Sequence, residues 1–347
     1  MTIHYHLQPL SEPETANWDQ LIAPYESREL FHRKVWLDYL AASRGAEIRM
    51  WSIQDGCETL GYLCGGIVRK GPFRIFGSPL KGWGTNFMGP VGNGTLDQPA
   101  FLQALDELAQ REGFAISEME SRGWGREPFQ GAGYHTQDLW TYQVKLGDED
   151  EMLRRMDKGR RYGIRKAERA GLWVEEAADP AVADEYYDLF TALMGRKGMV
   201  PPYPREVPRV LFAHLRRAGL ILALRVRDSA GKLLAIGLFP YDDRSIYYWG
   251  GAGDKKAEKE CPNDLMHWTV MRWAAERGIR RYDLCGWGRF KREFGGELLT
   301  LNRWHKCYWR TARWARRGYE FCFQRRIRLR GWFQQIASQP ESKGGSS

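Results

Sequence analysis

One segment of the sequence occurs twice, and a duplicated unit restricts the possible folds more than any other feature of the chain. Residues 121–144 (SRGWGREPFQGAGYHTQDLWTYQV) resemble residues 284–309 (LCGWGRFKREFGGELLTLNRWHKCYW) at a separation of 163 positions. Both copies hold Gly-Trp-Gly-Arg, followed by Phe, glycines and an aromatic strand. Each copy is preceded by a helical pattern, a turn of Arg-Glu-Gly or Glu-Arg-Gly, and a short strand. The shared order predicts two copies of one structural unit.

The order of helices and strands predicts an α+β fold with mixed central sheets flanked by helices. In each half a meander of strands precedes a helix and two more strands, which is not the order of a doubly wound parallel sheet. Expected helices cover residues 31–43, 98–112, 160–170, 181–194, 205–218 and 263–277. Expected strands cover residues 47–53, 59–68, 73–76, 220–226, 233–239, 245–249 and 303–308, with three more near residues 115, 139 and 282.

The length of 347 residues favours two hydrophobic cores, because a single core usually stops growing at a shorter length. The polar connector GDEDE at residues 147–151 marks the expected join. We therefore expect a first domain at residues 1–147 and a second at residues 148–312. A basic C-terminal helix and a disordered tail are expected at residues 313–347.

Positive charge is concentrated in two stretches of the sequence. Residues 303–330 hold ten Lys or Arg and one acid, Glu320, so they carry as much net charge as the whole chain, which is +9. Residues 153–169 hold eight bases and two acids. Such stretches favour a polyanionic partner: RNA, a diphosphate-bearing substrate or an anionic membrane surface. A solvated charged face without a partner is the other interpretation.

The second half resembles the Fem-type (FemABX) family of aminoacyl-tRNA-dependent peptidyltransferases, within the GNAT superfamily. The resemblance rests on RKAERAG at residues 165–171, RKGMVPPYP at 196–204, YYWGGAG at 247–253 and the continuous stretch 261–296. It covers residues 149–309 well and the first half weakly. It implies two tandem GNAT-like domains, in agreement with the repeat.

The resemblance also implies a catalytic pair, Phe290 and Lys291, in the motif Phe-Lys-x-x-Phe-Gly-Gly. Attack of an amine on an ester passes through a tetrahedral oxyanion, which a fixed cation such as Lys291 stabilises. Substrate contacts by resemblance, or by position beside the motif, are assigned to Lys34, Trp36, Arg196, Tyr203 and Arg289. Three acids that end expected strands, Glu118, Glu120 and Asp283, are more typical of structural hydrogen-bond acceptors than of a catalytic base.

The donor expected from the sequence is aminoacyl-tRNA, as a co-substrate and without a cofactor. Acetyl-CoA enzymes of this superfamily resemble one another in a Gly-rich loop that holds the pyrophosphate before a helix. Here the loop before residue 263 reads GDKKAEKECPND, and Pro262 removes a backbone donor. Basic residues expected to contact RNA are Arg165, Lys166, Arg313, Arg316 and Arg317; the tryptophans interleaved in the C-terminal segment are Trp304, Trp309, Trp314 and Trp332.

The acceptor expected is an amine on a peptidoglycan precursor, peptide or related metabolite, with phosphate as one of its groups. Two alternatives stay open. One is an acyl-CoA-dependent N-acyltransferase in polysaccharide or cell-envelope biosynthesis. The other is a non-catalytic assembly protein whose C-terminal helix contacts an anionic membrane.

Several function classes lack their sequence signals. The seven histidines form no HxxxH or HExxH pair, and neither Gly-x-Ser-x-Gly nor a Walker Gly-Lys-Ser/Thr is present, so neither a metal nor nucleotide hydrolysis is expected. The six cysteines lack CxxC spacing and are expected to be buried thiols. With neither a signal peptide pattern nor a bilayer-spanning apolar run, the cytoplasm is the expected location.

Overall fold

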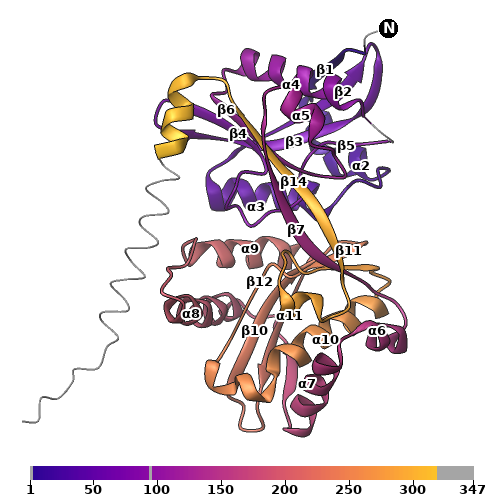
Figure 1. The fold of residues 1–347 in the computed structure, drawn as a ribbon, viewed down its shortest axis with the longest axis vertical. Coiled ribbons are helices and arrows are strands. Elements are labelled where there is room, and N and C mark those ends of the chain that lie inside the picture. The colour runs from indigo at the N-terminus through magenta and orange to yellow at the C-terminus, as the bar shows by residue number, and fades with distance from the viewer. Residues whose placement is uncertain (1–2, 94–95, 319–347) are drawn as a thin grey trace, which may run out of the picture.

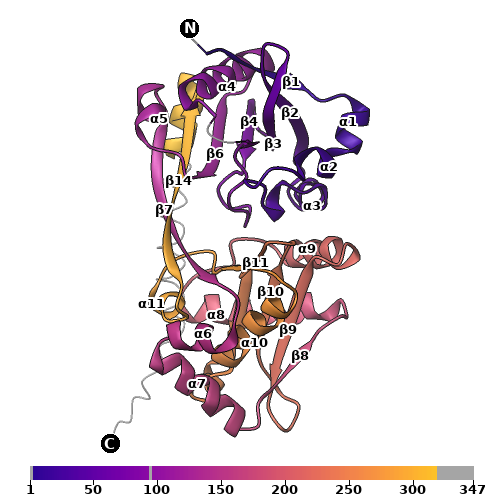
Figure 2. The ribbon, with the colours of Figure 1, turned by 90° about the vertical axis from the view of Figure 1, so that its right-hand side faces the viewer.

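The computed structural model describes residues 3–93 and 96–318. Two halves are stacked along the long axis of the molecule, and a ribbon of two long strands runs from one half to the other (Figures 1 and 2). The predicted α+β class with mixed sheets flanked by helices is confirmed.

The first half contains a meander of strands with helices on its faces. Its strands are β1 (Tyr5–Pro9), β2 (Glu47–Asp55), β3 (Glu58–Lys70), β4 (Phe73–Ser78), β5 (Val91–Gly92), β6 (Ile116–Arg122) and β7 (His135–Lys145). Its helices are α1 (Glu12–Ala16), α2 (Trp18–Ile22), η1 (Leu30–His32), α3 (Lys34–Arg44), α4 (Gln98–Glu112) and α5 (Glu127–Gly131).

The second half begins with helices and ends with the second long strand. Its helices are α6 (Glu149–Arg155), α7 (Lys158–Arg169), α8 (Ala181–Arg196), α9 (Glu206–Arg217), η2 (Lys255–Glu260), α10 (Pro262–Glu276) and α11 (Arg289–Arg292). Its strands are β8 (Trp173–Glu176), β9 (Ile221–Arg227), β10 (Leu233–Pro240), β11 (Ser245–Tyr247), β12 (Gly250–Gly253), β13 (Arg281–Asp283) and β14 (Glu297–Cys307). Residues 310–318 are helical after β14.

The internal repeat is present as a repeated order of elements. The first copy runs α4, β6, the Gly-Trp-Gly-Arg bend, α5 and β7, and the second runs α10, β13, the same bend, α11 and β14. Because the elements occur in the same order with the same bend between them, the duplication predicted from the sequence accounts for the arrangement of both halves.

The two copies exchange their last strands. Strand β14 pairs antiparallel with β6 of the first copy (Leu301 opposite Arg122), and β7 pairs antiparallel with β13 of the second (Val144 opposite Tyr282). β7 and β14 also pair with each other, so one sheet runs β1-β2-β3-β4-β6-β14-β7-β13-β11 through both halves. The domain ranges 1–147 and 148–312 stay predictions. Residues 297–307 belong to the second of these ranges, but they add a strand to the sheet of the first half.

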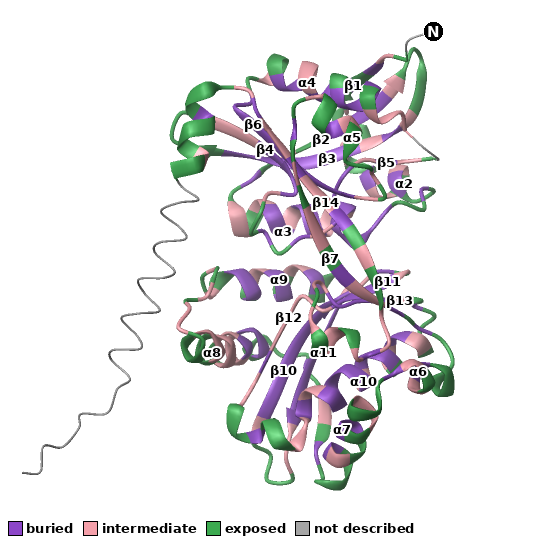
Figure 3. Cartoon of the chain, viewed as in Figure 1, coloured by how far each residue is buried: buried purple, intermediate pink, exposed green. Residues whose placement is uncertain are grey.

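Buried side chains also connect the halves. One hydrophobic cluster contains Trp36 and Leu40 of α3 together with Leu211 and Leu215 of α9, and all four are fully buried. The sheets are buried inside each half, whereas the middle of the β7–β14 ribbon is more exposed (Figure 3). The halves therefore pack through α3 and α9 on one side and through continuous strands on the other.

Some expectations differ from the structure. Cys57 is exposed, and Cys261 and Cys285 are only partly buried, so the expectation of buried thiols is correct for Cys64 and Cys307 alone among the described cysteines. Cys322 and the predicted tail lie outside the described residues, as does the larger part of the C-terminal helix. Over the described part of the chain, the helices are all too short or too polar to cross a bilayer.

The burial of Trp304, a residue of the exchanged strand β14, predicts a loss of stability when its side chain is removed. Trp304 of β14 is fully buried in the core of the first half, where its ring centroid lies 4.2 Å from that of Phe129 and its indole N–H donates to Ser121 Oγ at 3.1 Å. Trp304→Ala is expected to lower the free energy of unfolding by about 3–5 kcal/mol, because it leaves a cavity and an unpaired hydroxyl. Urea unfolding measures this. The control Trp314→Ala removes an indole that is 70% exposed and should change stability by less than about 0.5 kcal/mol.

Candidate active site at the join of the two units

The sheet of the second half divides next to β13. Strand β11 pairs parallel with β13, whereas β12, which follows two residues later, pairs with β10 in a separate sheet. Tyr248 and Trp249 form the step between the two sheets. The two sheets diverge at the end of β13, where the Asp283 carbonyl accepts from the Tyr248 amide at 2.8 Å.

The Gly-Trp-Gly-Arg bend follows β13 at this point. Cys285 has φ 51°, Gly286 has φ 143° and Gly288 has φ 137°. The last two values lie in a region that glycine alone adopts readily. The bend turns the chain back, so that α11 brings Lys291 over it.

Lys291 is partly buried and points at the bend. Its Nζ donates to the Cys285 carbonyl at 3.2 Å and lies 5.5 Å from the centre of the Tyr248 ring. Burial lowers the pKa of Lys291, although Cys285 and Asp283 act in the opposite direction. The ammonium group is thus fixed in a partly desolvated place, which strengthens its interaction with a developing negative charge.

A buried histidine lies among aromatic rings behind Lys291. Nδ1 of His267 is 2.6 Å from the hydroxyl of Tyr282, and its Nε2 is buried without a hydrogen-bond partner in the described structure. Its ring packs against Tyr248 and Phe294, with centroids 4.6 and 4.8 Å away. Burial, helped by the charges of Lys291 and Arg160, lowers the pKa of His267 to about 3, so the imidazole is neutral at physiological pH.

A polar network at the join connects the bend to the first half. Asp283 is fully buried, and its Oδ1 accepts from the Thr141 hydroxyl at 2.7 Å and the Cys285 amide at 2.8 Å. Arg122 Nη2 lies 3.6 Å from Asp283 Oδ2, and Arg122 Nη1 lies 3.3 Å from Glu29 Oε1. Burial raises the pKa of Asp283, against the effect of its hydrogen bonds and of Arg122.

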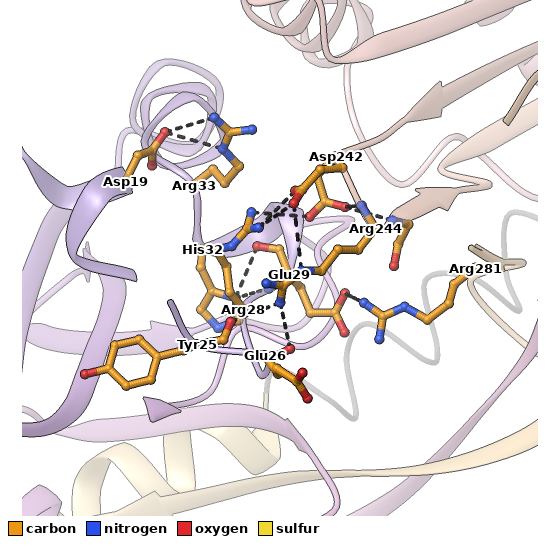
Figure 4. A network of polar contacts seen from close by, with 12 residues as sticks. Asp19, Tyr25, Glu26, Arg28, Glu29, His32, Arg33, Asp242, Arg244 and Arg281 are labelled. Carbon is orange, nitrogen blue, oxygen red and sulfur yellow. Dashed lines mark hydrogen bonds and ion pairs between the residues drawn. The ribbon is translucent and has the colours of Figure 1, made fainter. Parts of the chain in front are cut away.

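Glu29 is the centre of the second part of this network (Figure 4). It accepts a hydrogen bond from the hydroxyl of Tyr247 and lies 3.7 Å from Arg281 Nη2, so both halves hold the same carboxylate. Nearby, Arg244 Nη1 donates to the Tyr25 carbonyl at 3.0 Å. These contacts fix the loop before η1 against the second half.

A cavity of about 390 Å³ opens beside the network. Its wall contains Glu29, Arg122 and Arg281, together with Phe87 and Trp124. The Arg122 guanidinium lies 4.3 Å from the centre of the Phe87 ring. Through Arg122, Asp283 and the Cys285 amide, the wall of the cavity is connected to the bend that carries Lys291. The cavity therefore offers a polar binding place that these buried contacts connect to the bend, although Lys291 is not one of its lining residues.

The residues beside Lys291 have other contacts. Phe290 packs into the core of the second half under the Arg160 guanidinium, 4.5 Å away. Arg289 is 86% exposed and donates to Glu293 at 2.6 Å, which raises its pKa. Neither side chain reaches the cavity.

Among the described residues, no hydrogen bond, ion pair or ring contact joins two of the predicted substrate-binding residues. Trp36 is fully buried and donates to Thr85 Oγ1 at 3.0 Å, so its indole lines no ligand site in this conformation. Lys34 forms an ion pair with Asp38 on the same helix. Arg196 is exposed and donates to the Gly253 carbonyl at 3.2 Å.

Tyr203 packs in an aromatic group at the join. Its hydroxyl lies 2.7 Å from that of Tyr186, and its ring packs against Phe190 and Trp249, with centroids 5.4 and 5.5 Å away. Burial raises the pKa of Tyr203 to about 12. Its hydroxyl is therefore a neutral hydrogen-bonding group.

The predicted RNA contacts fall at opposite ends of the molecule. Arg165 is exposed and Lys166 partly exposed on α7 in the lower half, whereas the helix at 310–318 packs on the upper half (Figures 1 and 2). Arg313 and Arg317 are exposed, but Arg316 Nη1 lies 2.8 Å from the buried carboxylate of Glu118. Residues 153–169 and the described part of the second stretch, residues 303–318, do not form one continuous surface.

The acids at the end of β6 are structural. Glu118 accepts from the Lys81 amide at 2.6 Å, and Glu120 pairs with Arg303 at 2.6 Å. Both are buried between β6 and β14. The interpretation of these acids as hydrogen-bond acceptors agrees with these contacts.

One group of side chains in the described ranges has the spacing of metal ligands: His4, His6 and Glu107. They lie between the first strand and α4, and His4 Nε2 is 3.7 Å from Glu107 Oε2. Helical histidine spacing does not describe this pair, because the two histidines of an His-x-His pair on a strand point to one face. No contact connects this group to Lys291 within the part of the chain that the structure describes.

Comparison with known proteins agrees with this architecture. The family model described as an acetyltransferase (GNAT) domain matches residues 154–296. The solved structure of FemX has a TM-score of 0.66 at 14% identity, covering 85% of this chain and 96% of FemX. L-PGS from Bacillus licheniformis has a TM-score of 0.52 at 15% identity, covering 86% of this chain and 94% of that one.

A tandem GNAT protein from the clavulanic acid biosynthesis pathway has a TM-score of 0.50 at 13% identity, covering 87% of this chain and 98% of that one. No curated protein matches the sequence. At these identities the likenesses show the fold, and the predicted tandem GNAT architecture is confirmed. With the matched domain, they support an acyltransferase of the GNAT fold.

His267 gives a pH prediction. The unfolded imidazole takes up a proton near pH 6.5, whereas the folded one does so only near pH 3. Between these values the unfolded state binds more protons, so stability falls as the pH falls, by about 1.4 kcal/mol per pH unit from this group. His267→Gln should reduce the slope of unfolding free energy against pH between 6 and 4, measured by urea unfolding. His214→Gln is the surface control, and an unchanged slope in His267→Gln would contradict the assignment.

Proposed function

We propose that this protein is a Fem-like aminoacyltransferase that moves an amino acid from aminoacyl-tRNA to an amine acceptor and forms an amide bond. The observation that carries the proposal is the half-buried ammonium group of Lys291, held at the glycine bend where the sheet of the second unit divides. The acceptor class is an amine on a peptidoglycan precursor, a peptide or a related metabolite.

In the proposed reaction the acceptor nitrogen attacks the ester carbonyl carbon of the donor. The carbonyl oxygen becomes an oxyanion, which Lys291 stabilises. The carbon–oxygen bond to the ribose then breaks, and the proton lost by the nitrogen passes to the ribose oxygen, directly or through water. One well-placed donor to an oxyanion contributes roughly 3 kcal/mol to lowering the barrier. The lysine needs no change of protonation state in this scheme.

The start of α10 supports a donor other than acetyl-CoA. A helix N-terminus that binds pyrophosphate needs free backbone N–H groups. Here α10 begins with Pro262, which has no N–H, after Cys261 in a left-handed conformation. The carboxylate of Asp264 is buried in the first turn and pairs with Arg160 at 2.6 Å. This negative charge already occupies the positive end of the helix dipole.

The cavity supports a polar acceptor. Arg122 and Arg281 present guanidinium groups that are 28% and 30% exposed, which suits a carboxylate or phosphate on the acceptor. Glu29 lies between them and pairs with both, so the wall of the cavity also carries a negative charge. These are the charges that an amine-bearing, anionic acceptor requires.

A donor competition tests the proposal. The purified protein is incubated with a pool of radiolabelled aminoacyl-tRNAs and amine acceptors, with and without prior ribonuclease treatment, and in parallel with labelled acetyl-CoA. Amide product should form only from intact aminoacyl-tRNA. Acyl transfer from acetyl-CoA that persists after ribonuclease treatment would contradict the proposal.

Lys291→Met tests the role of the lysine. Turnover should fall tenfold or more, because the oxyanion loses its cation. The free energy of unfolding should not fall, since the substitution removes a charge that burial disfavours. The exposed lysine at the end of β3 provides the control variant Lys70→Met, which should keep both values. Normal turnover in Lys291→Met would remove the assigned role.

A further inference from the structure

The tryptophan of the second Gly-Trp-Gly-Arg bend is largely exposed, whereas that of the first is partly buried. Trp124 of the first copy packs against Phe101 and Trp304, with ring centroids 5.1 and 6.4 Å away. Trp287 of the second copy is 70% exposed, and its ring contact among the described residues is with Trp140. In the first copy this tryptophan packs in the core. Core packing does not explain the exposed position of Trp287 in the second copy.

Trp287 belongs to an exposed apolar patch. Trp140 of β7 is 40% exposed, with its ring centroid 6.2 Å from that of Trp287 at an angle of 70°. Leu298 of β14 is 52% exposed and lies opposite Tyr142, which shares the face of Trp140 because it is two residues along the strand. Contiguous exposed apolar surface of this kind usually marks a binding site.

The surroundings of the patch are positively charged. Arg289, Lys291 and Arg292 of α11 lie two to five positions after Trp287, and the acid that follows α11, Glu293, is already paired with Arg289 and Arg160. Helix α7 packs beside α11 through Arg160. The outer side of α7 carries further exposed residues of the same kind: Lys158, Tyr162, Arg165 and Arg169. Flat aromatic rings beside cations are the surface that unpaired nucleotides bind.

We propose that Trp287 and Trp140 form a stacking platform for the unpaired nucleotides at the 3′ end of the donor RNA. This inference rests on the function proposed above and adds the part of the donor that the protein holds. Lys291 is four positions after Trp287, which limits the distance between their Cα atoms to about 14 Å. Stacked nucleotides rise about 3.4 Å each, so a base on the platform lies within a few nucleotides of an ester placed at Lys291.

The test compares binding of intact deacylated tRNA with binding of the same tRNA lacking its unpaired 3′ nucleotides. Fluorescence anisotropy at fixed salt should give about tenfold tighter binding of the intact RNA by the wild type. Trp287→Ala should bind both RNAs alike, with the loss confined to the intact one. Trp287→Phe, which keeps a ring, should restore part of the difference. Trp173→Ala removes a 46% exposed indole on β8 and is the matched control.

The outcomes separate the two proposals. If Trp287→Ala keeps the wild-type preference for intact tRNA, the platform is wrong, even where the wild type transfers amino acids from tRNA. If Trp287→Ala instead loses binding to vesicles of anionic lipid while tRNA binding is unchanged, the patch is a membrane contact and the platform is also wrong. If the wild type neither binds tRNA nor transfers from it, the proposed function fails and the platform with it. Thermal unfolding of Trp287→Ala should match the wild type, because the indole is mostly in solvent.

Discussion

The exchange of β7 and β14 is the constraint on which the rest of the structure depends. A strand edge leaves a row of backbone donors and acceptors that must be paired or solvated. β6 of the first copy gains its neighbour from β14, and β13 of the second gains its neighbour from β7. Neither copy completes its sheet alone. The two copies are therefore held in one relative orientation by main-chain hydrogen bonds, and side chains from both can form a single site.

The fixed orientation of the two copies brings buried charged side chains together at the join. Asp283 and Glu29 are buried carboxylates, and removing each from water costs several kcal/mol unless partners compensate. Arg122 lies between them, and the Thr141 hydroxyl and the Cys285 amide both donate to Oδ1 of Asp283. Such a network adds little net stability but fixes geometry. Since Cys285 begins the bend under Lys291, residues of both copies determine where the ammonium group lies.

Local signals made most of the fold predictable. Helix α4 has the expected bounds 98–112, and Asp97, Pro99 and Gly113 mark its two ends in the structure. The short strands β5, β8 and β12 give no periodic pattern and were missed, whereas the equally short β11 and β13 were expected. The site was predictable only where a continuous motif carries it, as at Lys291. Contacts such as Tyr247 with Glu29, 218 residues apart, leave no local signal, and α3 gave no sign that Trp36 faces the core rather than a ligand.

The two copies of the bend differ in the direction in which the same residue points. In the first copy the indole of Trp124 closes the core beside Trp304, a side chain supplied by the exchanged strand β14. In the second copy the space behind the bend is filled by Phe290, Phe294 and His267. Trp287 is then left in solvent next to the lysine. The two bends share one sequence, but the core behind the second bend is filled by residues of its own copy, so the tryptophan of that copy takes no part in core packing.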